Sequence, residues 1–238
     1  MEVRDLGLPY YVDRISNNEP FSFVRYGDGE WSAAILHNRA RTGTGSHSLT
    51  IPQMVRDLQR SLTSIYQVDS YFVATRPNAV AQNPLIERWL LVNTPKGTQW
   101  NECRIFCQAS MRATLNPFIT ALRNLEIPLV FVGPDWLRGL KDVAFPKALF
   151  IEVPHLDCYH AKAALNLQVR KMPKPALISF SAGPAAKILI HELFPLLGNR
   201  SFMLDLGSLW DVYVGRYTRG YHRHRMNAEI IETNLRWS

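Results

Sequence analysis

The amino-acid sequence predicts an α/β fold of the Rossmann-like type: an open, mostly parallel sheet with helices on both faces. Short apolar runs alternate with amphipathic stretches, several of the runs are continuously β-branched or aromatic, and three prolines stand where helices should begin. Continuous apolar runs are typical of strands that are covered on both faces. The chain of 238 residues contains no repeat, low-complexity tract or Pro/Ser-rich linker, so we expect one domain, residues 1–238.

The apolar runs predict strands, in chain order, at residues 21–25, 70–74, 104–107, 129–133, 149–153, 176–181 and 201–206. The amphipathic stretches predict helices at residues 30–38, 52–66, 84–91, 110–125, 158–171 and 184–197. Pro52, Pro84 and Pro184 suit the first turn of a helix, because the N–H group that proline lacks has no intrahelical partner there.

The composition is that of a globular protein that buries a core, since 47% of the residues are hydrophobic and 20% are charged. No run of roughly 18 apolar residues could cross a membrane, and the N-terminus lacks the basic and then apolar pattern of a secretion signal. The odd count of three cysteines speaks against a disulfide framework. The sequence therefore predicts a cytoplasmic protein. Its net charge of +7 predicts an anionic partner, such as a nucleotide, a phosphate, a nucleic acid or a membrane surface.

Polar residues follow the first predicted strand, and ligands of open α/β sheets bind beyond the carboxyl ends of the strands. Gly27 and Gly29 allow the backbone to turn sharply and to contact a ligand. Asp28 and Glu30 offer oxygen ligands suited to Mg²⁺ or Mn²⁺, and Arg25 stands where it can meet a diphosphate. The alternative is a tight turn in which Asp28 caps a helix. That alternative does not account for both glycines, both acids and the arginine.

A second turn with small residues follows the predicted strand 176–181 and leads into the helix that begins at Pro184. Free N–H groups at a helix start bind anions, so Ser181 and Gly183 are candidate contacts of a phosphate. A plain strand-to-helix turn explains the same pattern equally well. We do not expect Ser181 to be a hydrolase nucleophile, because Ser179 stands where a nucleophile elbow has glycine.

Two aspartates lie near the end of the last predicted strand, one within it and one after it. Asp205 and Asp211 are candidates for a metal ligand, for a contact to a ribose hydroxyl, or for a base that acts on an acceptor hydroxyl. In the alternative interpretation, Asp205 stabilises a turn and Asp211 faces water.

The C-terminal segment, residues 215–238, begins with the most basic stretch of the chain, which holds four arginines between residues 216 and 225. Arginines with aromatic residues and a glycine suit a mobile phosphate clamp over a site, for which Arg216 and Arg219 are the candidates. The same composition could hold nucleic acid through phosphates and stacking, or it could form a solvated basic tail.

Further candidates are weaker. Arg76, Asn78 and Asn83 follow the predicted strand 70–74 and are possible contacts to a nucleotide or an acceptor. Cys103 and Cys107 stand at the two ends of the predicted strand 104–107, where we expect them to be small buried hydrophobic residues.

Residues 21–30, with the sequence Phe-Ser-Phe-Val-Arg-Tyr-Gly-Asp-Gly-Glu, resemble the opening motif of the GT-D fold glycosyltransferases, a family first defined as a domain of unknown function. The stretches that begin at Ser181, Asp205 and Gly215 resemble that family in the same order. The resemblance implies a Rossmann-like domain, a nucleotide-sugar donor with UDP-glucose as the usual example, and a Mn²⁺ or Mg²⁺ ion held by an Asp-x-Glu element, here Asp28 and Glu30. The C-terminal Arg/His run is richer than the family pattern, which leaves the acceptor contacts open.

The leading hypothesis is therefore metal-dependent transfer of a sugar from a UDP-sugar to a hydroxyl of a glycan, a lipid-linked saccharide or a protein. The metal on Asp28 and Glu30, together with Arg25 and the C-terminal arginines, would offset the charge of the departing diphosphate. Asp205 or Asp211 would act as the base.

Two other classes remain open. A methyltransferase is one, because Asp205-x-Gly207 faintly resembles a methyl-donor loop. A non-catalytic module that binds nucleic acid is the other. We rank it lowest, because it would not require the turn from Arg25 to Glu30.

Overall fold

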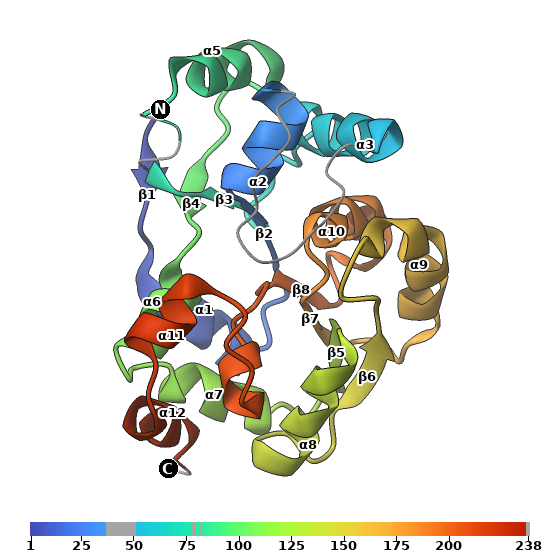
Figure 1. Ribbon diagram of the computed structural model, residues 1–238. Helices are drawn as coiled ribbons and strands as arrows, with labels where there is room; N and C mark the ends of the chain where they lie inside the picture. The colour runs from blue at the N-terminus through green and yellow to red at the C-terminus, as the bar shows by residue number, and fades with distance from the viewer. Residues whose placement is uncertain (37–50, 78–79, 81, 237–238) are drawn as a thin grey trace.

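The computed structural model describes residues 1–36, 51–77, 80 and 82–236. Within this part of the chain, eight strands form one sheet in the order β1-β4-β3-β2-β8-β7-β5-β6, and every neighbouring pair is parallel. In Figure 1 the strands follow one another in this order from left to right. The strands are β1 (Val3–Arg4), β2 (Ser22–Tyr26), β3 (Tyr71–Thr75), β4 (Trp100–Glu102), β5 (Leu129–Gly133), β6 (Leu149–Glu152), β7 (Leu177–Phe180) and β8 (Phe202–Asp205).

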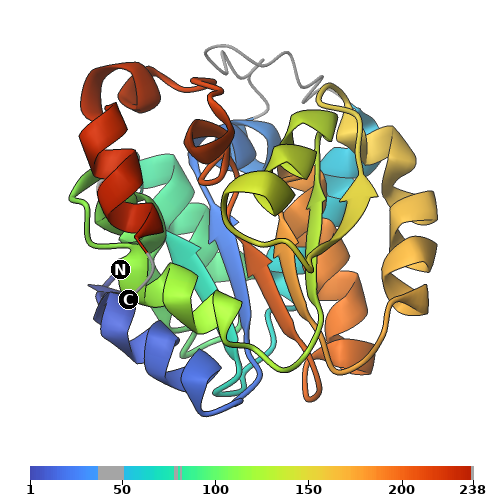
Figure 2. The ribbon, with the colours of Figure 1, turned by 90° about the horizontal axis from the view of Figure 1, so that it is seen from below.

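Helices cover both faces of this sheet, which confirms the predicted α/β, Rossmann-like class. The two helical layers are visible in Figure 2 on either side of the strands. One layer contains α3 (Pro52–Thr63), α5 (Pro84–Asn93), α9 (Lys162–Lys171) and α10 (Pro184–Leu197). The other contains α1 (Gly7–Ser16), α6 (Ile105–Met111), α7 (Asn116–Arg123), α8 (Leu140–Val143) and α12 (Ala228–Leu235). Shorter elements are α2 (Asp28–Trp31), the π-helix η1 (Ser32–Leu36), the 3-10 helices η2 (Asp135–Gly139), η3 (Cys158–Ala161) and η4 (Asp211–Val214), and α11 (Gly220–Arg225).

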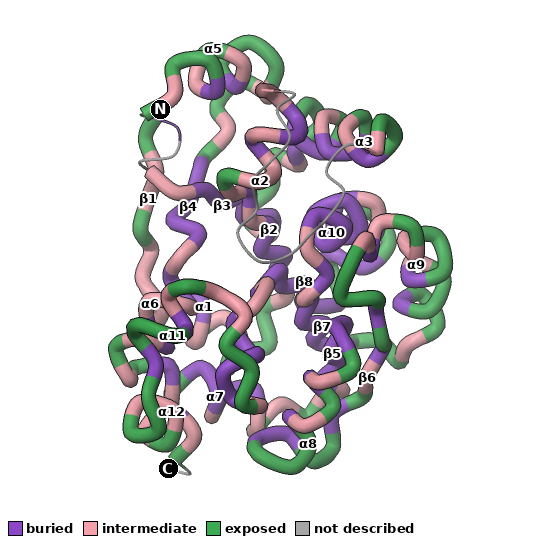
Figure 3. Tube along the Cα trace, viewed as in Figure 1, coloured by how far each residue is buried: buried purple, intermediate pink, exposed green. Residues whose placement is uncertain are grey.

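Each strand of the sheet centre sends its side chains alternately into two hydrophobic cores. Phe23 and Phe202 pack into the core on the α1 side, whereas Val24 and Met203 pack into the core on the α10 side. All four side chains are fully buried. Burial on both faces explains why β2 and β8 read as continuous apolar runs in the sequence. Figure 3 shows the same pattern, with buried strands in the middle and mixed exposure on the outer helices.

Six of the predicted strands are confirmed, but the strand expected at residues 104–107 is wrong. The strand that pairs with β3 lies just before these residues: it is β4, and the chain turns directly after it. Glu102 fixes this turn, because its carboxylate accepts hydrogen bonds from the backbone N–H and the guanidinium of Arg104. Helix α6 follows directly, and it buries Ile105 and Phe106. The apolar run was therefore the buried face of a helix, which periodicity alone cannot distinguish from a short strand.

The region predicted as one helix at residues 110–125 belongs to two helices, because α6 ends at Met111 and α7 begins at Asn116. Ala113 has a φ of 57°, a left-handed conformation that no helix interior contains. Pro117 then stands in the first turn of α7. The helix predicted at residues 30–38 begins as α2 and continues as the π-helix η1 to Leu36, and residues 37–38 lie outside the described part of the chain. Helices α1, α8, α11 and α12 were not predicted.

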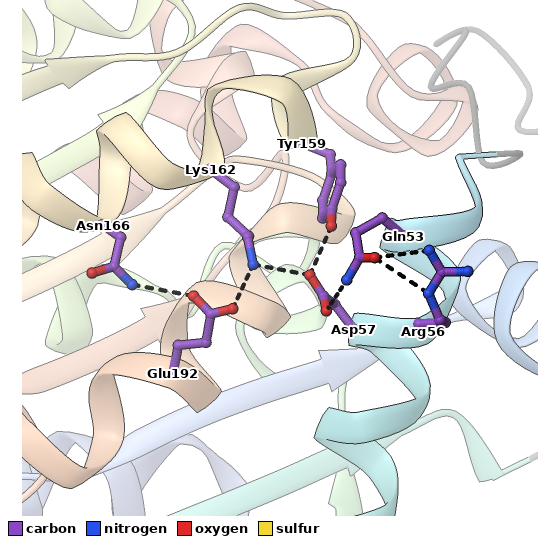
Figure 4. A network of polar contacts seen from close by, with 7 residues as sticks. All are labelled: Gln53, Arg56, Asp57, Tyr159, Lys162, Asn166 and Glu192. Carbon is purple, nitrogen blue, oxygen red and sulfur yellow. Dashed lines mark hydrogen bonds and ion pairs between the residues drawn. The ribbon is translucent and has the colours of Figure 1, made fainter.

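A polar network holds α9 against α3 and α10 (Figure 4). The ammonium of Lys162 lies 2.9 Å from Oδ2 of Asp57 on α3 and 2.5 Å from Oε1 of Glu192 on α10. Tyr159 donates a second hydrogen bond to Oδ2 of Asp57, at 2.7 Å, and Gln53 donates one to Oδ1, at 3.0 Å. Asp57 is buried, and burial raises the pKa of its carboxyl group, but these donors outweigh burial and lower the pKa. One lysine thus joins three helices on one face of the sheet.

In the described part of the chain, no helix is both long enough and apolar enough to cross a membrane.

Candidate active site

A cavity of about 610 Å³ lies beyond the carboxyl ends of the strands. Residues that follow every strand from β2 to β8 line it, among them Gly27, Arg76, Ser181 and Gly207. A second hollow, of about 730 Å³, lies at the amino ends of β2 and β5 and is lined mostly by apolar and uncharged polar residues of α1 and α7. Ligands of parallel α/β sheets bind at the carboxyl ends, so the first cavity is the candidate active site.

Lys187 stands at the floor of this cavity. Its ammonium lies 2.9 Å from Oε1 of Glu30, 3.0 Å from Oδ2 of Asp205 and 3.0 Å from the carbonyl oxygen of Gly183. The side chain is 6% exposed, yet the two carboxylates outweigh the effect of burial and raise the pKa of Lys187. Burial raises the pKa of Glu30, but the ammonium of Lys187 and the hydrogen bond from the N–H of Gly27 outweigh burial and lower this pKa. A charged triad therefore joins the turns after β2 and β7 to the end of β8.

Arg25 extends this ionic floor. Its Nη2 atom lies 3.4 Å from Oδ1 of Asp205, whose side chain is fully buried. Burial disfavours the charge on Arg25, but Asp205 outweighs burial and raises the pKa of the guanidinium. Asp205 therefore has a cation on each of its two oxygens and stands behind Arg25 and Lys187 rather than among the lining residues.

Gly207 lies against the guanidinium of Arg25. A Cβ at this position would overlap Nη2 of Arg25, and the residue has a φ of +55°, which favours glycine. The Asp-x-Gly pattern after β8 is thus explained by an ion pair and by the space that its arginine needs. It therefore lends no support to a methyl-donor loop.

The predicted metal ligands Asp28 and Glu30 both line the cavity, but their carboxylates differ. Both oxygens of Glu30 have partners, in Lys187 and in the N–H of Gly27. Asp28 is exposed, and its Oδ2 lies 3.1 Å from Nη1 of Arg76. Within the described ranges, no group of three or more His, Cys, Asp or Glu side chains could hold a metal ion. The donor set therefore does not fit a divalent ion between Asp28 and Glu30, and the Mn²⁺ or Mg²⁺ ion stays a prediction.

Ser181 and Gly183 line the cavity beside the first turn of α10. The Oγ atom of Ser181 is buried and has no hydrogen-bond partner among the described residues. A buried hydroxyl without a partner is costly, so this atom is a candidate for contact with a ligand. Gly183 has a φ of +54° at the helix start, which explains why glycine precedes Pro184. Gly29, predicted to contact the ligand, also lines the cavity.

Asp211 is a buried carboxylate of the cavity wall. It accepts hydrogen bonds from Nε1 of Trp136, at 3.0 Å, and from the hydroxyl of Thr218. Burial raises the pKa of Asp211, and these two hydrogen bonds only partly oppose the rise. The alternative interpretation, in which Asp211 faces water, is wrong, since the residue is 5% exposed.

The basic C-terminal segment closes one side of the cavity with Thr218, Arg219 and Tyr221. Arg216 is exposed and does not line the cavity; its guanidinium lies 5.8 Å from the ring centroid of Trp136. The segment is held in place, because Ser208 and the hydroxyl of Tyr221 are 3.2 Å apart and the N–H of Arg219 donates to Nδ1 of His222.

The sequence interpretation assigned no role to the lining residues Lys187, Arg104 and Trp136. A lysine within the apolar start of the helix at residues 184–197 was the signal for the first. Arg104 was hidden by the wrong strand, and nothing in the sequence distinguished Trp136 from a core tryptophan. Arg76 was named as a possible contact and does line the cavity, whereas Asn78 lies outside the described residues.

No family model matches the sequence, and no curated protein matches it. Solved structures do. A structure described as "A New Glycosyltransferase (DUF1792) from Streptococcus sanguinis" superposes with a TM-score of 0.62 at 17% identity, over 100% of this chain and 95% of that one. A structure described as "The highly conserved domain of unknown function 1792 has a distinct glycosyltransferase fold" gives 0.59 at 17% identity, over 97% of this chain and 88% of that one.

A third, the selenomethionine form of domain of unknown function 1792, gives a TM-score of 0.61 at 16% identity, with the same coverage of 97% and 88%. Identities this low carry the backbone arrangement rather than the site. Because nearly the full length of each chain is matched, the protein shares the fold of the DUF1792 structures.

Proposed function

We propose that the protein is a glycosyltransferase that moves a sugar from a nucleotide-diphosphate sugar, a UDP-sugar, to an acceptor hydroxyl. The observation that carries the proposal is the cavity at the carboxyl ends of β2 to β8. Cations, a helix start and carboxylates converge there, in a fold shared with structures described as glycosyltransferases. Fold likeness alone does not assign a reaction, so the chemistry of the cavity carries the argument.

The diphosphate of the donor would lie between the first turn of α10 and the arginines of the cavity wall. Ser181 supplies a buried hydroxyl that has no hydrogen-bond partner in the part of the chain that the structure describes, and the N–H groups at the start of α10 favour an anion. Among the described residues, Arg76 forms an ion pair with the exposed Asp28, and a phosphate can replace that partner at little cost. Arg219 approaches from the C-terminal segment. Fixed cations of this kind stabilise the negative charge that develops on a departing diphosphate.

The reaction would break the bond between the anomeric carbon and the diphosphate oxygen, and the electron pair would leave with the diphosphate. The acceptor oxygen would form the new bond to that carbon and lose its proton. We propose Asp211 as the base, because it lines the cavity and its pKa is raised by burial. Asp205, the other predicted base, is fully buried behind Arg25 and Lys187, which suits it to hold these cations instead. The acceptor would be a glycan, a lipid-linked saccharide or a protein hydroxyl.

Titration calorimetry with UDP, ADP, GDP and S-adenosylmethionine tests this proposal, together with an assay for UDP release from UDP-sugars. We expect UDP to bind, and Ser181→Ala and Arg219→Ala to weaken UDP binding by about tenfold each, the effect of one charge-assisted hydrogen bond. Arg170→Ala, on the exposed side of α9, is the control and should bind UDP like the unmodified protein. Binding of S-adenosylmethionine without any nucleoside diphosphate would overturn the proposal.

A further inference from the structure

The floor of the cavity contains a cation that belongs to the chain itself. Three oxygen atoms surround the ammonium of Lys187 at 2.9 to 3.0 Å: Oε1 of Glu30, Oδ2 of Asp205 and the carbonyl oxygen of Gly183. The ammonium donates a hydrogen bond to the carbonyl oxygen of Gly183 and forms ion pairs with the two carboxylates. The three oxygens come from the turn after β2, the turn after β7 and the end of β8. Such a set of carboxylate and carbonyl oxygens resembles the environment that a divalent ion would select.

The charges of this floor balance without an added ion. Lys187 and Arg25 contribute two positive charges, and Glu30 and Asp205 contribute two negative ones. Lys187 and Asp205 are buried, with side chains 6% and 0% exposed. A divalent ion at this place would have to displace a buried ammonium that is ion-paired with two carboxylates, and the displaced ammonium would then lack these partners.

We propose that Lys187 takes the place of a divalent cation between Glu30 and Asp205, so that binding of a nucleoside diphosphate to this cavity requires no metal ion. The inference rests on the proposed function for its ligand. It departs from the Asp-x-Glu metal site that the sequence resemblance implies. The ammonium positions Glu30, Asp205 and the turn at Gly183, where the phosphates are proposed to bind.

Electron paramagnetic resonance of MnCl₂ tests the cation site without any nucleotide. With the unmodified protein, the spectrum of free Mn²⁺ should remain unchanged. Lys187→Ala removes the ammonium and leaves two carboxylates and one carbonyl oxygen, so this variant should bind one Mn²⁺ per chain. The double variant Lys187→Ala with Glu30→Gln should lose that ion again. Binding of Mn²⁺ by the unmodified protein that Glu30→Gln abolishes would overturn the proposal, as would a folded Lys187→Ala that binds no Mn²⁺.

Titration of UDP in EDTA tests the consequence and needs no variant. The affinity of the unmodified protein for UDP should stay within twofold when EDTA replaces MnCl₂. A loss of tenfold or more in EDTA, restored by MnCl₂, would overturn the proposal even if Lys187→Ala did not fold. If UDP binds under neither condition, the proposed function fails, while the Mn²⁺ spectra still decide the role of Lys187.

Discussion

The guanidinium of Arg25 occupies the space in which a side chain at Gly207 would begin. The two residues lie on β2 and just after β8, which are neighbours in the sheet. Since Arg25 is also the partner of the buried Asp205, the missing side chain at residue 207 allows this ion pair to form. A glycine after one strand thus determines where a cation on the next strand can lie.

Gly207→Ala should displace Arg25 and destabilise the protein. The added methyl group would overlap the guanidinium of Arg25. In addition, residue 207 has a φ of +55°, a backbone conformation that costs roughly 1–2 kcal/mol for a residue with a side chain. We expect the free energy of unfolding in urea to fall by about 3 kcal/mol, because Asp205 loses part of its charge compensation. Gly215→Ala is the matched control. It has a φ of +72° but no atom within 4 Å of an added Cβ, so it should show only the backbone cost. Equal losses for the two variants would contradict this account.

Glu30→Gln should reduce stability far more than Asp28→Asn, although the two residues share one motif. Glu30 holds the buried Lys187, and removal of one partner of a buried pair costs about 3–5 kcal/mol. Asp28 is 69% exposed in its side chain, and its pair with Arg76 should contribute about 0.5 kcal/mol or less.

The lowered pKa of Glu30 also predicts a dependence on pH. Its contribution is present above the unfolded pKa and is lost as pH falls through the folded value, so the two variants should become more alike in acid. Urea unfolding at neutral and at acidic pH measures both effects. A stability difference that stays constant down to the lowest pH would argue against an ionised Glu30.

Asp211→Asn tests the proposed base. An amide at this position can still accept from Trp136 but cannot take a proton, so kcat should fall by about 10² to 10⁴ while KM for the donor changes little. In the unmodified protein, kcat should fall on the acid side as Asp211 becomes protonated, at a pH above the ordinary range of an aspartate, because burial raises its pKa. The residual activity of the variant should lack that acid limb. A variant that keeps full kcat would exclude Asp211 as the base.

Much of the fold could be predicted because it depends on local patterns. Strands buried on both faces, such as β2 and β5, are continuous apolar runs, and Pro184 marks the start of α10. The failures have physical causes. Strand β4 has only three residues, two of them polar, and its pairing partners lie far away in sequence. No local pattern announces such a strand.

The candidate site could be predicted as a set of turns but not as a set of contacts. Residues after β2, β7 and β8 do meet at one cavity, as the strand-end rule requires. The rule does not say which carboxylate faces the cavity. That depends on the lysine of α10, which takes Glu30 and Asp205 as partners and leaves Asp28 exposed. Which carboxylate faces the cavity is therefore decided by ion pairs between residues far apart in sequence, and the spacing of residues along the chain cannot predict those pairs.

Lys162→Met should destabilise the protein by about 3 kcal/mol or more, because Asp57 would remain buried with its negative charge and without an ionic partner. The control is Arg138→Met. Arg138 also pairs with a carboxylate, that of Glu152, at 2.9 Å, but both side chains are more than half exposed, so its loss should cost about 0.5 kcal/mol or less. Thermal and urea unfolding of the two variants measure the difference. If both lost the same small amount, the network between α3, α9 and α10 would be no more than a surface feature.

His222 should make the C-terminal segment sensitive to acid. The side chain is 1% exposed, and burial, with Arg219 and Arg223 nearby, lowers its pKa from 6.5 to about 4. The neutral ring accepts the N–H of Arg219, which closes the first turn of α11. As pH falls from 6.5 towards 4, the unfolded chain takes up a proton that the folded chain refuses. The free energy of unfolding should therefore decrease across this window, by at most about 3 kcal/mol, and then level off.

His222→Gln isolates this contribution, because glutamine can accept the same N–H as part of a capping box and does not titrate. Between pH 6.5 and 4, the variant should lose less stability in urea than the unmodified protein does, while the two should differ little at pH 8. Other groups titrate in this range in both proteins, so the difference between the two curves is the relevant quantity. Parallel curves from pH 8 to 4 would mean that His222 is protonated as readily in the folded chain as in the unfolded one, and that α11 contains no buried neutral histidine.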